Sequence, residues 1–113
     1  MPYEPAYERF ETAGPDRTRV VAEFHKSGFL AAGDRPELYF FRIGEGDVIV
    51  GISGEALLVL QRAHRYLSRE EKIDVAGLCL KKRIEAGLPL TAENLSIRQP
   101  DLDLLIKELG IVL

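Results

Sequence analysis

The spacing of hydrophobic residues changes near residue 53. Val48, Val50 and Ile52 lie two positions apart, which is the repeat of one strand face. After them the apolar residues follow helical spacing, beginning with Leu57 and Leu60. This change of period predicts that strands occupy the chain before residue 53 and helices occupy it afterwards.

Three segments before residue 53 have the composition of strands. Residues 19–30 are rich in Val and Phe, with a possible bend or bulge at residues 26–28. Residues 38–43 are short, aromatic and bounded by turn residues, which predicts a well-buried strand. The tight connection at residues 44–47 makes residues 48–52 its hairpin partner.

Capping signals divide the second half of the chain into helices. Ser53 can cap a first helix over about residues 54–66. Ser68 and Glu71 have the spacing of a capping box, which predicts that a second helix covers residues 69–86. Gly87 suits the left-handed position after that helix, and Pro89 prevents its continuation.

A third helix is predicted between Pro100 and Gly110. The expected fold is therefore α+β, with a small antiparallel sheet of about three strands packed against three C-terminal helices. We expect residues 18–113 to form one domain and residues 1–17 to form an extended N-terminal arm. The aromatic residues Tyr3, Tyr7 and Phe10 could dock this arm onto the domain, and a frayed tail is the alternative.

Composition and charge exclude some general roles. The chain has 113 residues and a hydrophobic fraction of 46%, which is typical of a globular domain. Its net charge is −3, so its overall charge does not attract it to nucleic acid or anionic membranes. The single cysteine, Cys79, cannot form an intramolecular disulfide and fits a reducing compartment. No apolar run approaches the ~20 residues that a membrane span needs, and residues 1–17 lack the apolar core of a signal peptide. We therefore expect a cytoplasmic protein.

No residue pattern predicts catalysis, a metal site or a cofactor. The two histidines, His25 and His64, lack the spacing of metal ligands, and Cys79 lies in an apolar helical run. Ser53 follows a strand and precedes a helix, as in a nucleophile elbow, but Glu55 stands where that motif needs its second glycine. We expect no catalytic residues, no metal and no cofactor, and an enzyme with an unrecognised site stays an alternative.

Basic residues are concentrated between positions 62 and 83. They can stabilise helix C-termini, or they can form a patch that contacts an anion or a partner. The candidate contact residues are Arg62, Arg65, Arg69, Lys81, Lys82 and Arg83.

Two helical segments are apolar around most of the helix. Residues 56–60 and 75–80 contain almost only apolar side chains, and such helices are normally buried on more than one side. A layer of helices covered by the C-terminal tail is one solution, and a homodimer is the other. The leading hypothesis is a non-enzymatic protein-interaction or accessory module that self-associates. The alternative is a nucleic-acid-binding regulator that uses the basic segment 62–83.

Overall fold

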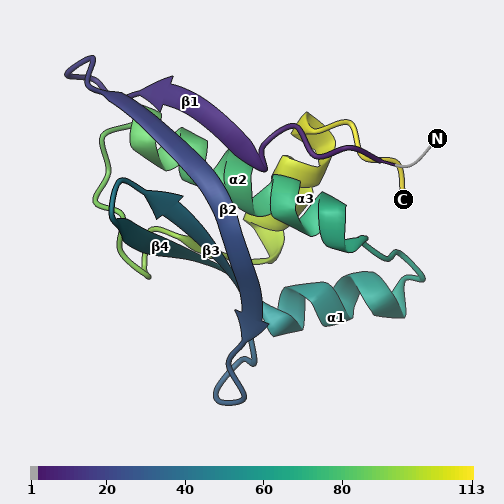
Figure 1. Ribbon diagram of the computed structural model, residues 1–113. Coiled ribbons are helices and arrows are strands. Elements are labelled where there is room, and N and C mark those ends of the chain that lie inside the picture. Colours follow the sequence, from purple (N-terminus) through teal and green to yellow (C-terminus); the bar gives the residue numbers. More distant parts are fainter. Residues whose placement is uncertain (1–2) are drawn as a thin grey trace.

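The computed structural model describes residues 3–113, and these residues form one α+β unit (Figure 1). Five strands and three helices lie in this part of the chain. In chain order they are β1 (Arg9–Ala13), β2 (Arg19–Phe29), β3 (Glu37–Ile43), β4 (Gly46–Ile52), α1 (Gly54–Arg62), α2 (Arg69–Glu85), β5 (Ser96–Ile97) and α3 (Gln99–Glu108).

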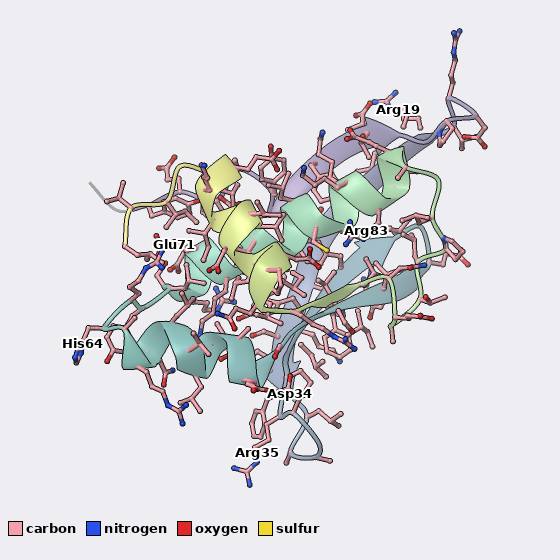
Figure 2. The ribbon with its side chains drawn as sticks, turned by 180° about the vertical axis from the view of Figure 1, so that it is seen from behind. Arg19, Asp34, Arg35, His64, Glu71 and Arg83 are labelled. Carbon is pink, nitrogen blue, oxygen red and sulfur yellow. The ribbon has the colours of Figure 1, made fainter. Side chains whose placement is uncertain are left out.

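The strands form a single sheet in the order β1-β2-β3-β4-β5. The first four strands pair antiparallel, and the two-residue strand β5 pairs parallel to β4. All three helices lie on one side of the sheet, as the front and back views together show (Figures 1 and 2). Among the described residues, no helix lies on the opposite face of the sheet.

The α+β class is confirmed, but the prediction of about three antiparallel strands is wrong. β1 lies in the segment that the sequence predicted as an extended arm, where Pro and Gly residues hid a strand of five residues. β5 is too short to show a periodic pattern, and it forms only because the chain after α2 returns to the edge of β4. The sheet is therefore mixed and larger than predicted.

The predicted β3–β4 hairpin and the strand at β2 are confirmed. β3 and β4 pair from Ile43 opposite Gly46 to Glu37 opposite Ile52. The register of β2 against β3 shifts between Phe24 and Lys26, so the bulge lies at the N-terminal edge of the predicted 26–28 segment. Phe24 and Lys26 therefore pair with the consecutive residues Phe41 and Phe40 of β3, and the residue between them is the extra residue of the bulge.

The predicted caps are confirmed, but α1 is shorter than predicted. The Ser53 hydroxyl accepts a hydrogen bond from the Ala56 N–H, and Ser68 forms a complete capping box with Glu71. α1 ends at Arg62 because His64 adopts a left-handed φ of 57°. The Arg65 N–H then donates to the Leu60 carbonyl at 2.9 Å, which closes the helix before residue 66.

Helix α2 occupies the centre of the molecule. Every residue from Ile73 to Leu80 is buried, and the helix contacts β1, β3, β4 and α3. Figure 2 shows α3 on the side of α2 away from the strands. The apolar segment 75–80 is thus covered within a single chain, without a second copy.

The N-terminal arm docks onto α2, which decides between the two alternatives for the described residues from Tyr3 onward. Asp74 is fully buried, and its carboxylate accepts hydrogen bonds from the N–H groups of Ala6, at 3.0 Å, and Tyr7, at 2.7 Å. The Tyr3 hydroxyl donates to the same carboxylate. Burial raises the pKa of Tyr3, and its hydrogen bond to Asp74 raises it further.

Gly77 allows the arm to approach α2 closely. A Cβ atom on Gly77 would clash with the backbone carbonyl and the Cβ of Tyr7. Asp74 and Gly77 lie three positions apart, so they share one face of α2. This face of α2 packs against the N-terminal segment of the chain.

Candidate interaction surface

The face of the sheet that carries no helix has an apolar half, which we call the open-face patch. Side chains alternate between the two faces of a strand, and Tyr39, Phe41, Val50 and Ile52 point into the core. Their neighbours on β3 and β4 therefore point outward. The open-face patch consists of Leu30, Pro36, Leu38, Phe40 and Ile49.

Contacts across the strands place these side chains on the same face. A Cβ atom added to Gly51 would lie 3.8 Å from Leu38 Cδ2 and 3.9 Å from the Cβ of Pro36. The Lys26 Nζ lies 5.0 Å from the centroid of the Phe40 ring, a cation–π contact. Ile49 is the direct cross-strand partner of Phe40.

The open-face patch is accessible in the single chain. Leu30 is 52% exposed and Ile49 is 42% exposed, whereas Pro36, Leu38 and Phe40 are half-buried. Scattered exposed apolar residues are normal, but a contiguous apolar surface without cover is typical of an interaction site.

The other half of the same face is polar and its charges are paired. Arg42 lies 3.7 Å from the carboxylate of Asp47, and His25 lies 3.3 Å from that carboxylate. Arg9 and Glu23 form a further ion pair at 3.5 Å across β1 and β2. These exposed pairs add little stability, but they leave the face close to neutral.

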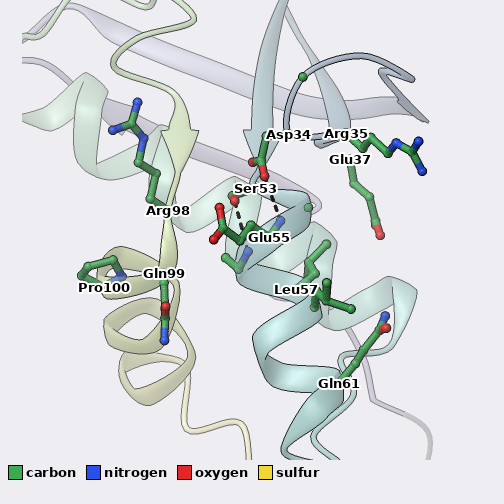
Figure 3. Close-up of a pocket in the computed structure, with 14 residues that line it drawn as sticks. Asp34, Arg35, Glu37, Ser53, Glu55, Leu57, Gln61, Arg98, Gln99 and Pro100 are labelled. Carbon is green, nitrogen blue, oxygen red and sulfur yellow. Dashed lines mark hydrogen bonds between the residues drawn. The ribbon is translucent and has the colours of Figure 1, made fainter.

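A groove in the surface lies between α1 and the start of α3. This broad groove has a volume of about 1040 Å³ (Figure 3). Asp34, Ser53 and Glu55 meet at the start of α1, whereas Arg35 and Arg98 extend to opposite sides.

The polar groups at the start of α1 already have structural partners. The Asp34 carboxylate accepts from the Glu55 N–H at 3.0 Å, and the Ser53 hydroxyl accepts from Ala56. Hydrogen bonds from the Ser53 hydroxyl and the Glu55 N–H lower the pKa of Asp34. These contacts cap α1, as Ser53 was predicted to do, and they attach the β2–β3 connection to it.

The six basic candidate residues fall into two separate groups. Arg62 and Arg65 lie at the connection between α1 and α2, and Arg69 begins α2, with its guanidinium 5.4 Å from the centroid of the Phe24 ring. Lys81, Lys82 and Arg83 lie toward the other end of α2, at least about 18 Å further along the helix axis. Figure 2 shows this separation between His64, at the connection, and Arg83.

The second group has partners within the chain. Lys81 contacts Glu85 at 2.7 Å, and Lys82 contacts Glu108 at 2.9 Å. The Arg83 Nε donates to the carbonyl of Asn94 at 2.9 Å, which holds the segment that leads to β5. Each of these three side chains therefore already has a partner within the chain.

The remaining candidates for chemistry are placed as follows. Cys79 is buried in the core as predicted, and burial raises the pKa of its thiol to about 11. His25 contacts Asp47 on the open face, and His64 lies at the end of α1. Within residues 3–113, no group of three or more His, Cys, Asp or Glu side chains is close enough together to hold a metal ion.

Two features of the surface and the arm were missed in the sequence. The sequence does not reveal the open-face patch, because the aromatic segment 38–43 predicts a well-buried strand. Asp74 could have been noticed as the one charged residue among the buried residues 73–80. An acid in an apolar helical run needs hydrogen-bond donors, and the arm supplies them.

Comparisons with known proteins give no further assignment. Neither a family model, nor a curated protein, nor a solved structure matches this chain. Among the helices of residues 3–113, none combines the length and the apolar character that a membrane crossing requires.

Proposed function

We propose that this chain is a non-enzymatic protein-interaction module and that the open-face patch is its contact surface. The observation that carries the proposal is the cluster of five apolar side chains on a sheet face that no helix covers. Antiparallel sheets normally expose a polar face to water, so an apolar half-face favours a partner.

The helices support this proposal only indirectly. The sequence favoured self-association because segments 56–60 and 75–80 are so apolar. In the fold, α2 is sealed by the sheet, α3 and the arm, and Ala56, Leu57 and Leu60 of α1 face the core. Leu58 of α1 and Leu104 of α3 are also exposed, at 42% and 66%, so the proposal depends on the clustering of apolar residues on the sheet and not on exposure alone.

Site-specific photo-crosslinking in cells tests the proposal. A photoreactive residue at position 49 lies in the open-face patch, and one at position 21 lies in the charged half of the same face. Ile49 and Val21 are a matched pair, being 42% and 39% exposed. We expect protein adducts from position 49 and few from position 21.

The same experiment distinguishes the other functions. Adducts from positions 65 and 82 that a nuclease removes would support the nucleic-acid-binding alternative, which needs cations free to contact phosphates. Equal adduct yields from positions 49 and 21, or none from position 49, would contradict the proposed function.

A further inference from the structure

We propose that the open-face patch binds the same patch of a second copy, so that two sheets stack face to face about a two-fold axis. This inference depends on the proposed function, because it names the partner that occupies the surface. It is carried by the complementarity of two rows of side chains that cross the sheet.

The two rows have different shapes. In the first row, Leu38 lies between two glycines, because its cross-strand partners are Gly28 on β2 and Gly51 on β4. In the second row, Phe40 lies between Lys26 and Ile49. The first row is hollow on both sides of Leu38, and the second row is filled across its width.

The hollow in the first row is open space at Gly28, whereas at Gly51 the side chains of Leu38 and Pro36 border it. A Cβ atom on Gly28 would meet nothing within 4 Å, and one on Gly51 would meet Leu38 and Pro36 only at ordinary contact distance. A larger residue than glycine would fit at either position, so lack of space within the chain does not explain these two glycines. A partner that inserts a side chain there would explain why both stay open.

A two-fold axis that crosses the strands between the rows brings opposite rows together. Each Ile49 then lies over Gly51 of the other copy, and each Leu38 lies against Phe40 of the other copy. Lys26 lies over Gly28 of the other copy at the border, where its ammonium group can remain in water. Every contact occurs twice in such a closed dimer, and stacked sheets lie about 10 Å apart.

The charges beside the rows favour this partner over a strongly charged one. The ion pairs of Asp47 with Arg42 and of Glu23 with Arg9 neutralise most of the face. A polyanion would need several free cations, whereas the ammonium group of Lys26 lies over the Phe40 ring of the patch. A nearly neutral face is compatible with a copy of itself, since no like charges are forced together.

The size of the patch predicts a weak dimer. Three strands ~4.8 Å apart and about five residues long cover roughly 240 Å². Standard stable interfaces bury about 800 Å² on each partner. We therefore expect dissociation in the micromolar range or weaker, and a mass that changes with concentration.

Two charge variants at one position test the geometry. Gly28→Glu places a carboxylate opposite Lys26 of the other copy, and Gly28→Lys places a like charge there. Both side chains project into open space in the single chain, so neither should prevent folding. Sedimentation equilibrium from about 1 µM to about 1 mM should show several-fold tighter association for Gly28→Glu and several-fold weaker association for Gly28→Lys.

The outcomes separate this inference from the proposed function. A wild-type chain that stays monomeric to the highest concentration, or a dimer that both variants leave unchanged, overturns the two-fold stacking. In that case the proposed function still stands if crosslinks from position 49 join the chain to a different protein. If position 49 yields no protein adduct, both proposals fail.

Discussion

Helix α2 and the outward residues of the central strands are both rich in apolar side chains, yet the fold treats them differently. Residues 73–80 of α2 are sealed by the sheet, by α3 and by the N-terminal arm. The open-face patch on β2, β3 and β4 has no such cover, and Leu30 and Ile49 stay exposed. Apolar content therefore does not identify an interaction surface until the fold shows which part of it is covered.

The sealed region depends most on Asp74, so its removal should have the largest effect. Asp74→Ala leaves the N–H groups of Ala6 and Tyr7 without an acceptor, and we expect a loss of about 3 kcal/mol in the free energy of unfolding. Urea denaturation measures this loss. Asp74→Asn keeps one acceptor oxygen and should lose about half as much. Equal stability of all three proteins would contradict an anchoring role for this carboxylate.

Two glycines test the contrast between covered and open surfaces directly. Gly77→Ala should lower the free energy of unfolding by about 2 kcal/mol, because the new Cβ clashes with Tyr7 and outweighs the better helix propensity of Ala. Gly28→Ala adds the same methyl group in open space on the sheet and should change stability by less than about 0.5 kcal/mol. Thermal and urea unfolding of the pair measure the difference. If Gly77→Ala leaves the free energy of unfolding unchanged, the arm does not pack closely on α2.

The anchoring of the arm should weaken in alkali. The pKa of Tyr3 is raised above its ordinary value of 10.0, mainly by burial and then by Asp74. Because the folded state favours the protonated hydroxyl, this contribution is complete below pH 10 and decreases as the pH rises above it. Tyr3→Phe should cost about 1 kcal/mol at pH 8.

The variant isolates Tyr3 from other groups that titrate in alkali. Burial also raises the pKa of Cys79 to about 11, so wild type and Tyr3→Phe should both lose stability at high pH. The gap between their free energies of unfolding should narrow between pH 8 and pH 11. A constant gap would contradict the role of the Tyr3 hydroxyl.

The open region should show the smallest effect on stability. Ile49 is 42% exposed, so Ile49→Lys should change the free energy of unfolding by less than about 1 kcal/mol. The same substitution should weaken the proposed association at least tenfold, because a partly desolvated charge would face an apolar surface. Urea unfolding and sedimentation equilibrium on the same sample check both statements. A large loss of stability would mean that Ile49 belongs to the core.

Much of the local structure could be predicted from the chain. The β3–β4 hairpin, the caps at Ser53 and Ser68 and the left-handed Gly87 were all predicted, because each depends on residues within a few positions of one another. The end of α1 was missed because His64, rather than a glycine, adopts the left-handed conformation. Such a histidine gives no sequence signal.

The candidate surface could not be predicted in the same way. Residues 38–43 form a short aromatic run, which predicts a well-buried strand and does not show that one of its faces is left without cover. Only the position of the helices decided that Leu38 and Phe40 lie on the face without cover. The sequence offered Arg62, Arg65, Arg69, Lys81, Lys82 and Arg83 as candidate contact residues, with stabilisation of helix ends as the other interpretation. Crosslinking is still to test that prediction.

The amino-acid sequence by itself determined the β3–β4 hairpin, the helix caps and the α+β class, since these depend on short-range spacing and hydrogen bonds. The tertiary structure alone decided which apolar residues are sealed and which stay open. The hydrogen bonds that anchor the arm to Asp74 join residues 67 to 71 positions apart, and no local pattern encodes such a contact. Burial is a property of the whole packed chain, so the surface available to a partner exists only once distant segments have met.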